Sequence, residues 1–195
     1  MKRSMIVAAL LLTAAVAGVG YGQVDFLVNA RPASILIDSS GGKFSAEGAD
    51  GRVSMSQVYA MPNISLGAGI EFGDAYLDIT GGGGVVINDT FRSFLLQASL
   101  ALNYTLSESL IAGPRLGLVY FPDPDWTEND DVDFDDSFGL LAGLQLSMGD
   151  KIQYLVSVDL IDVNFDADFD SGVVSEDDEL DLSGIAFQFG VRGEF

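Results

Sequence analysis

Apolar side chains alternate with small or polar ones over two long stretches of the chain. From 94 to 106 the even positions are apolar or aromatic, while the odd positions include Gln97, Ser99 and Asn103. The same period of two runs from 138 to 148, where Gln145 and Ser147 separate bulky apolar residues. A helix would repeat its apolar positions every three to four residues, so this pattern predicts β-strands.

Weaker copies of the alternation bring the expected strands to eight, at 24–30, 64–72, 75–79, 94–106, 110–120, 138–148, 152–160 and 185–195. Three short turn sequences, Gly73-Asp74, Ser107-Glu108 and Gly149-Asp150, alternate with long polar stretches at 38–51, 81–92, 121–136 and 162–181. The second long stretch contains four consecutive glycines at 81–84 and is expected to be a flexible loop. Short turns at one end and long loops at the other are typical of an up-and-down barrel.

The composition of the two faces indicates which one meets water. The polar face of the strands at 94–106 and 138–148 carries no charged residue, whereas a water-exposed surface is typically about 25–35% charged. Small polar side chains suit the narrow interior of an eight-stranded barrel, with the apolar face turned to lipid. We therefore expect an all-β fold, an eight-stranded antiparallel up-and-down transmembrane β-barrel. A soluble lipocalin-type carrier would require the opposite assignment of the faces.

The other strands place charged residues on this inward face. The expected interior charge network comprises Glu71, Asp78, Arg115, Asp159 and Arg192. An unpaired buried charge is strongly unfavourable, so Arg115 and Arg192 are expected to pair with these acids in a packed interior. Eight strands enclose little more than side chains, and we expect no open pore.

Composition and charge exclude several functions. The 195 residues include 29 acidic and 9 basic side chains, for a formal charge of −20, and neither Cys nor His. A nucleic-acid partner is not expected, because such proteins present a basic surface. The absence of Cys and His excludes disulfides, thiol nucleophiles, the usual zinc ligands and His-based triads. A Ser-Lys or paired-carboxylate mechanism is not excluded in principle, but we expect a non-enzymatic protein without a cofactor.

The start of the chain resembles a targeting segment. Lys2 and Arg3 precede an apolar run at 5–20, and Gly20 and Gly22 supply small residues before a cut. This pattern predicts a secretory signal peptide at 1–22, followed by the barrel at 23–195.

Acidic residues concentrate in two of the expected loops, 121–136 and 162–181, which together hold 17 of the 29. Two series repeat a carboxylate at every second position: Asp131, Asp133, Asp135 and Asp166, Asp168, Asp170. Hard cations take six to eight oxygen ligands, so weak, collective Ca²⁺ or Mg²⁺ binding is one hypothesis, and a solvated anionic surface is the other. The apolar positions change parity at 160–163 and at 182–185, which predicts bulges where strands leave the membrane.

The last nine residues, FQFGVRGEF, combine an alternating strand with Gln188, Gly190 and a terminal Phe195. In this the chain resembles small Gram-negative outer-membrane barrels of the OmpA/OmpX type, although Gly193 stands where a bulky apolar residue is usual. The resemblance implies that the outer-membrane assembly machinery reads these three residues. It further implies a monomer in the cell outer membrane, surrounded by lipid and lipopolysaccharide. The expected function is a surface or structural role with weak divalent-cation or lipopolysaccharide contact. The alternative is an OmpW-like barrel that passes small apolar solutes.

Overall fold

The computed structural model describes residues 23–39, 45–48, 51–54, 56–122, 124–126, 132–169, 174–175 and 179–195. The expected signal peptide at 1–22 lies outside them. Every regular element in the described part is a strand. No helix there is long and apolar enough to cross a membrane.

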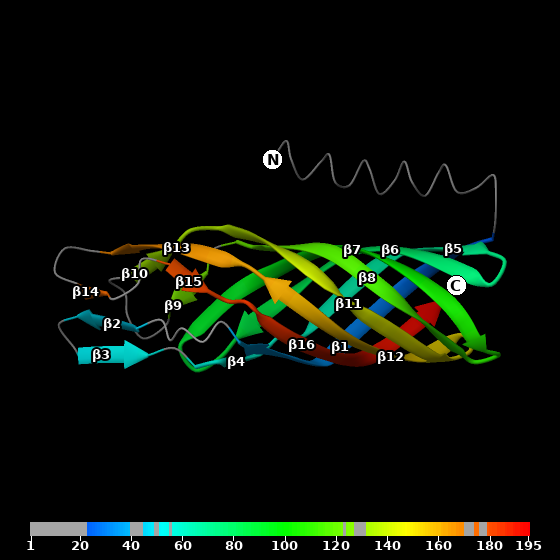
Figure 1. The fold of residues 1–195 in the computed structure, drawn as a ribbon, viewed down its shortest axis with the longest axis horizontal. Coiled ribbons are helices and arrows are strands. Elements are labelled where there is room, and N and C mark those ends of the chain that lie inside the picture. Colours follow the sequence, from blue (N-terminus) through cyan, green and yellow to red (C-terminus); the bar gives the residue numbers. More distant parts are fainter. Residues whose placement is uncertain are drawn as a thin grey trace.

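Eight long strands form the wall of the molecule: β1 (Val24–Asp38), β5 (Asn63–Phe72), β6 (Ala75–Ile87), β7 (Phe91–Ser107), β8 (Leu110–Phe121), β11 (Ser137–Gly149), β12 (Ile152–Asp162) and β16 (Gly184–Glu194). Each pairs antiparallel with the next, and β16 pairs back with β1, which closes the ring (Figure 1). The remaining strands are short: β2 (Ser45–Gly48), β3 (Gly51–Ser54), β4 (Val58–Ala60), β9 (Asp125–Trp126), β10 (Val132–Phe134), β13 (Asn164–Phe169), β14 (Val174–Ser175) and β15 (Glu179–Asp181). The predicted eight-stranded antiparallel up-and-down barrel is confirmed.

The two ends of the barrel differ. At the end that we call the turn end, tight turns at 73–74, 108–109 and 150–151 connect the strands, and Phe195 lies beside them. Gly73 has a φ of 67°, a left-handed conformation that glycine adopts without strain. At the opposite, loop end, the wall continues as β9, β10, β13 and β15, and the small sheet of β2, β3 and β14 lies beyond them (Figure 1).

The glycine run at 81–84 belongs to the wall, so its assignment to a flexible loop is wrong. Strand β6 continues through it to Ile87, and all four glycines are paired with both β5 and β7. A Cβ on Gly82 would lie 2.0 Å from the Ile64 carbonyl oxygen, and one on Gly84 would lie 2.2 Å from the Pro62 carbonyl oxygen. Glycine is required because the backbones of β5 and β6 approach each other too closely for any side chain.

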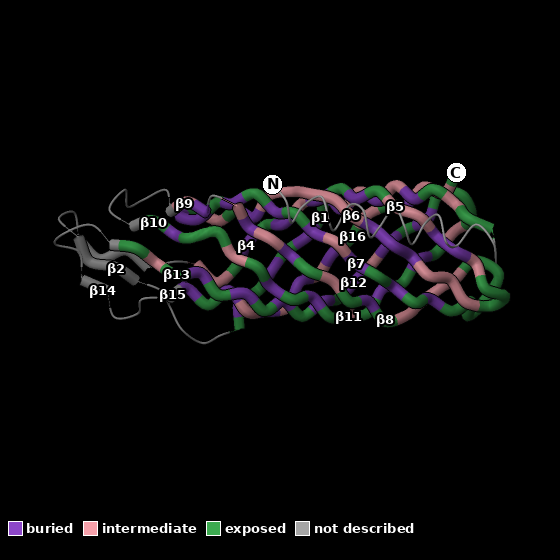
Figure 2. Tube along the Cα trace, turned by 90° about the horizontal axis from the view of Figure 1, so that it is seen from above, coloured by how far each residue is buried: buried purple, intermediate pink, exposed green. Residues whose placement is uncertain are grey.

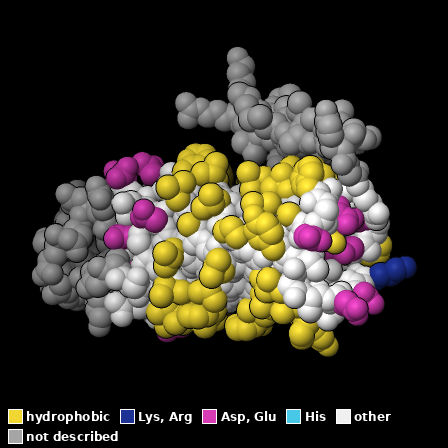
Figure 3. Space-filling view, turned by 45° about the vertical axis from the view of Figure 1, so that its right-hand side comes forward, with side chains coloured by type: hydrophobic (Ala, Val, Ile, Leu, Met, Phe, Trp, Pro, Cys, Tyr) yellow, Lys and Arg dark blue, Asp and Glu magenta, His cyan; other side chains and the backbone are white. Residues whose placement is uncertain are grey.

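An apolar belt surrounds the barrel. Figure 3 shows hydrophobic side chains in a band across the middle of the molecule, with acidic side chains toward both ends. Phe94, Leu116 and Leu144 belong to this belt and are 63%, 64% and 66% exposed. The apolar face of the alternating strands is therefore the outer one, as the sequence predicts.

Buried positions recur along all the wall strands (Figure 2), and their side chains form two tiers. The apolar tier fills the loop end with buried hydrophobic residues: Leu36, Tyr59, Met61, Val86, Phe91, Leu95, Val119, Phe121, Phe134, Leu141, Ile161, Val163, Phe165, Leu180, Leu182 and Ala186. Within it, Phe165 packs edge-on against Phe121 and Phe91, with ring centroids 5.5 and 5.8 Å apart. The polar tier lies toward the turn end and contains buried polar and charged residues.

The bulges predicted at 160–163 and 182–185 are absent. Along β12 and β13 the inward positions keep the same parity, from Asp159 through Ile161 and Val163 to Phe165. The inward face of β15 and β16 likewise runs from Leu182 to Arg192 without a shift. Toward the loop end the inward side chains change from polar to apolar, and the outward side chains become acidic. Both changes occur because the outside of the barrel faces water above the apolar belt. The described register shifts lie elsewhere, at 30–33 in β1 and at 105–107 in β7.

Candidate functional site

The polar tier is one continuous hydrogen-bond network with members on all eight wall strands: Asn29 and Arg31 on β1, Asn63 and Ser65 on β5, Asp78 and Thr80 on β6, Gln97, Ser99 and Asn103 on β7, Arg115 on β8, Gln145 on β11, Ser157 and Asp159 on β12, and Gln188 and Arg192 on β16. All of them are buried. Since each strand contributes, the network ties the wall together across the lumen and fills it.

Two buried ion pairs anchor the network. The Arg115 guanidinium lies 2.8 Å from an Asp159 oxygen, and the same oxygen accepts hydrogen bonds from Ser157 (2.8 Å) and Gln188 (2.9 Å). All these side chains are almost fully buried. The low local dielectric strengthens these charge-assisted contacts and makes the loss of either partner costly.

The second pair joins β16 to β6, two strands that are not neighbours in the wall. Arg192 lies 2.7 Å from an Asp78 oxygen, which also accepts hydrogen bonds from Asn103 (2.7 Å) and Gln145 (3.1 Å). The structure thus brings together four of the five residues expected in the interior charge network. Glu71 is the exception: it is half-buried at the turn end and forms no ion pair with another described residue.

Arg31 is a buried charged residue of the polar tier that the expected charge network omits. It is 1% exposed and donates to Asn63 (3.4 Å), Ser65 (3.3 Å) and Gln145 (3.4 Å), with no ion pair to any described carboxylate. The polar tier therefore holds three guanidinium groups and two carboxylates in the described part of the chain. In the sequence, Arg31 falls on the same alternate positions of the first strand as Asp25 and Asn29, and this placement indicates that its side chain points inward.

Four of the six acidic residues proposed for cation binding are described, and they lie on the outer surface of the loop end. Asp133 stands opposite Asp168 between β10 and β13, and opposite Asp125 between β10 and β9. Asp135 and Asp166 are also exposed, whereas Asp131 and Asp170 lie outside the described residues. Among the described residues, no three acidic side chains are grouped closely enough to hold a metal ion.

The residues proposed as the assembly signal occupy structural positions in the barrel. Gln188 bridges Asp159 and Asn63 inside the network. A Cβ on Gly190 would lie 2.0 Å from the Ala30 carbonyl oxygen, beside the irregular part of β1. The Phe195 backbone exchanges hydrogen bonds of 2.9 and 3.0 Å with Phe26, and its side chain is exposed.

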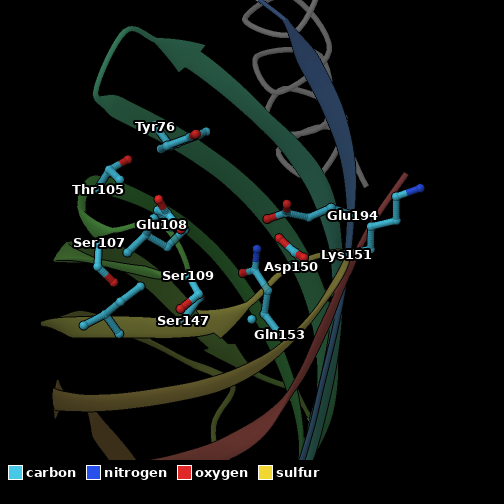
Figure 4. Close-up of a pocket in the computed structure, with 13 residues that line it drawn as sticks. Tyr76, Thr105, Ser107, Glu108, Ser109, Ser147, Asp150, Lys151, Gln153 and Glu194 are labelled. Atoms are coloured by element: carbon cyan, nitrogen blue, oxygen red, sulfur yellow. The ribbon is translucent and has the colours of Figure 1, made fainter.

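A cavity of about 270 Å³ opens at the turn end of the lumen; we call it the turn-end pocket. Its wall includes the carboxylates of Glu108, Asp150 and Glu194, and the buried side chains of Ser147 and Gln153. Figure 4 shows these groups around the mouth of the barrel.

A second cavity, of about 400 Å³, indents the outer wall; we call it the proline groove. It is lined mainly by apolar residues, including Ala30, Pro32, Pro62 and Phe94. Here β1 pairs with β5 only as far as Arg31 and resumes with β4 at Ile35. Neither proline has an N–H to donate, so the hydrogen-bond ladder of the wall is interrupted at this point.

No protein-family model matches the chain, and no curated protein matches it. Among solved structures it is similar to the outer membrane protein OprG from Pseudomonas aeruginosa, with 14% identity, a TM-score of 0.53, and coverage of 90% of this chain and 97% of that one. It is also similar to Neisserial surface protein A, with 18% identity, a TM-score of 0.40, and coverage of 87% and 97%. The likeness to OprG shows the fold, that of an outer-membrane β-barrel.

Proposed function

We propose that this chain is a closed, non-enzymatic barrel of the bacterial outer membrane with a role at the cell surface. One observation carries the proposal: an apolar belt surrounds a lumen that is filled by a network reaching all eight strands and by the apolar tier above it. A wall of this kind is stable in lipid, and a filled lumen leaves no continuous aqueous path.

Location in the outer membrane is supported by the belt and by the fold shared with OprG. The protein is expected to fractionate with outer membranes and to require detergent for extraction. It is also expected to migrate differently on gels before and after boiling, because a hydrogen-bonded barrel without edges resists detergent. Recovery of a soluble monomer from the periplasm without detergent would contradict this location.

The absence of catalysis is supported by the chemistry of the buried groups. The sequence holds no His or Cys, and the polar-tier serines Ser99 and Ser157 bond with Arg115 and its partners. Ser157 does donate to a carboxylate, that of Asp159, but the accepting oxygen is already ion-paired with Arg115 and also bonded by Gln188, and both residues are buried. The hydrogen bonds of the network therefore hold the strands of the wall together and do not activate a nucleophile.

The acidic outer surface supports weak, collective contact with Ca²⁺ or Mg²⁺, and through these cations with lipopolysaccharide. Asp133 and Asp168 stand opposite each other, and like charges about 5 Å apart in water repel by roughly 0.8 kcal/mol before salt screening. A divalent cation near the pair relieves this repulsion without a dedicated cage of ligands.

Millimolar Ca²⁺ is therefore expected to raise the unfolding temperature of the detergent-solubilised barrel by a few degrees, and EDTA is expected to reverse the rise. Asp168→Asn should reduce the response, while Asp74→Asn, at the turn end, should leave it unchanged. A response of micromolar affinity that one substitution abolishes would replace the collective model with a specific site. An unchanged melting temperature would leave only the solvated anionic surface.

The proline groove favours a second candidate function, the OmpW-like passage of small apolar solutes through the wall. It lies where β1 changes partner and is lined mainly by apolar groups. Filling it with Ala30→Phe should lower the uptake of a small apolar solute by cells if this candidate is right. Equal uptake by both forms would count against it.

A monomeric state, kinship with the OmpA/OmpX type, and reading of Gln188, Gly190 and Phe195 by the assembly machinery remain parts of the proposal. Gln188 and Gly190 have local structural roles, so assembly and stability must be measured separately for their variants.

A further inference from the structure

We propose that the turn-end pocket binds a linear polyamine. The pocket is anionic: Glu108, Asp150 and Glu194 line it, and the one cationic side chain in its wall, Lys151, extends away from them (Figure 4). Carboxylates around a partly enclosed mouth concentrate cations, because low-dielectric walls focus their field.

Buried oxygen atoms without partners supply a second, independent observation. Ser147 is 1% exposed and Gln153 is 7% exposed, and both line the pocket. The Ser147 Oγ and the Gln153 Oε1 form no hydrogen bond with any described residue. A buried acceptor is normally satisfied, so the Gln153 Oε1 is ready for a donor that enters the pocket. An ammonium group supplies up to three N–H donors and no acceptor.

The spacing of the acidic groups favours an extended organic cation over a metal ion. Ca²⁺ needs six to eight oxygens around one point, and no three described acidic side chains are grouped in this way. A linear polyamine carries its charges apart on short methylene chains, so separate ammonium groups can reach separate carboxylates. Tyr76 and Leu110 also line the pocket and offer apolar contact to the methylenes.

The polar tier limits how far such a ligand can enter. Arg192 and Arg115 lie deeper in the lumen and are ion-paired to Asp78 and Asp159, while Arg31 has no described ion-pair partner. The interior is therefore positive beyond the pocket, and a cation is held at the mouth rather than passed through the barrel.

Nuclear magnetic resonance on the ¹⁵N-labelled barrel in detergent micelles, titrated with spermidine, tests the proposal. Spermidine should give saturable shifts at the amides of 149–153, separate from any non-saturating shifts at the acidic loop end. Glu194→Gln should weaken the turn-end affinity about tenfold, the usual effect of losing a hydrogen bond to a charged group. Asp150→Asn, in an exposed turn, should weaken it as well.

Glu71→Gln is the matched control, because it removes a half-buried carboxylate from the same end of the barrel without touching the pocket. Its affinity should stay within about twofold of that of the native chain. Equal weakening by Glu71→Gln and Glu194→Gln, or spermidine shifts confined to the loop end, would overturn the proposal. The same saturable turn-end shifts with Mg²⁺ alone, at equal concentration, would also overturn it.

Discussion

Replacing Gly82 with Ala is expected to destabilise the barrel by more than about 4 kcal/mol, in the range of exceptional single substitutions. A Cβ at this position would lie 2.0 Å from the Ile64 carbonyl oxygen and 2.5 Å from the Ser65 Cα. These are backbone atoms of the neighbouring strand, so no side-chain rotation can relieve the clash. The strands β5 and β6 must separate, and their ladder of hydrogen bonds opens with them.

Gly69→Ala is the control for this prediction. Gly69 lies on β5, and a Cβ there would meet its nearest neighbours at 3.5 Å, an ordinary contact. This variant should fold like the native chain, with a stability change within about 1 kcal/mol. Unboiled gel mobility and urea unfolding in detergent measure both variants. Equal stability of the two would mean that β5 and β6 do not approach as closely as described.

Replacing Arg115 with Met should lower the free energy of unfolding by about 3–5 kcal/mol, because it leaves the buried Asp159 carboxylate without its counter-ion. Ser157 and Gln188 would still donate to this carboxylate, but neither carries a charge. Adding Asp159→Asn to Arg115→Met should recover part of the loss, since the double variant has no uncompensated charge. The non-additivity measures the coupling of the pair.

Arg92→Met provides the matched comparison. Arg92 lies 2.6 Å from Asp125, but the two side chains are 66% and 46% exposed. Exposed pairs contribute about 0–1 kcal/mol, so this variant should unfold almost like the native chain. If Arg115→Met and Arg92→Met had the same small effect, the interior pair would be solvated and the network would not hold the wall.

Much of the wall could be predicted from the sequence because an alternating strand reports its two faces directly. The strands at 94–106 and 138–148 lie within β7 and β11, with their apolar faces outward. The glycine run at 81–84 was misread because a strand that needs close backbone approach has the same composition as a loop. The distance between the backbones of β5 and β6 distinguishes a close-packed strand from a flexible loop, and this distance cannot be obtained from the sequence.

The loop end was misread for a different reason. Within the membrane, apolar side chains face outward to the lipid. Beyond the membrane the barrel is surrounded by water, so apolar residues such as Val163 and Phe165 face inward. The inward-facing positions stay the same, but they change from polar to apolar where the strand leaves the membrane. In the sequence this makes the apolar positions shift by one residue, which is the pattern that a bulge also produces. Arg31 lies in phase with the inward face but is left out of the expected charge network, because that network assumes ion pairing and this guanidinium is held by Asn63, Ser65 and Gln145.

Planar-bilayer conductance of the refolded barrel tests the central claim, a lumen closed by the polar and apolar tiers, most directly. Unboiled gel mobility and resistance to detergent verify that the barrel has refolded. After insertion into the bilayer, the refolded barrel should give no stepwise ion current. Stable, reproducible single-channel steps from the inserted native protein would contradict the account, because they require a continuous aqueous path through the lumen.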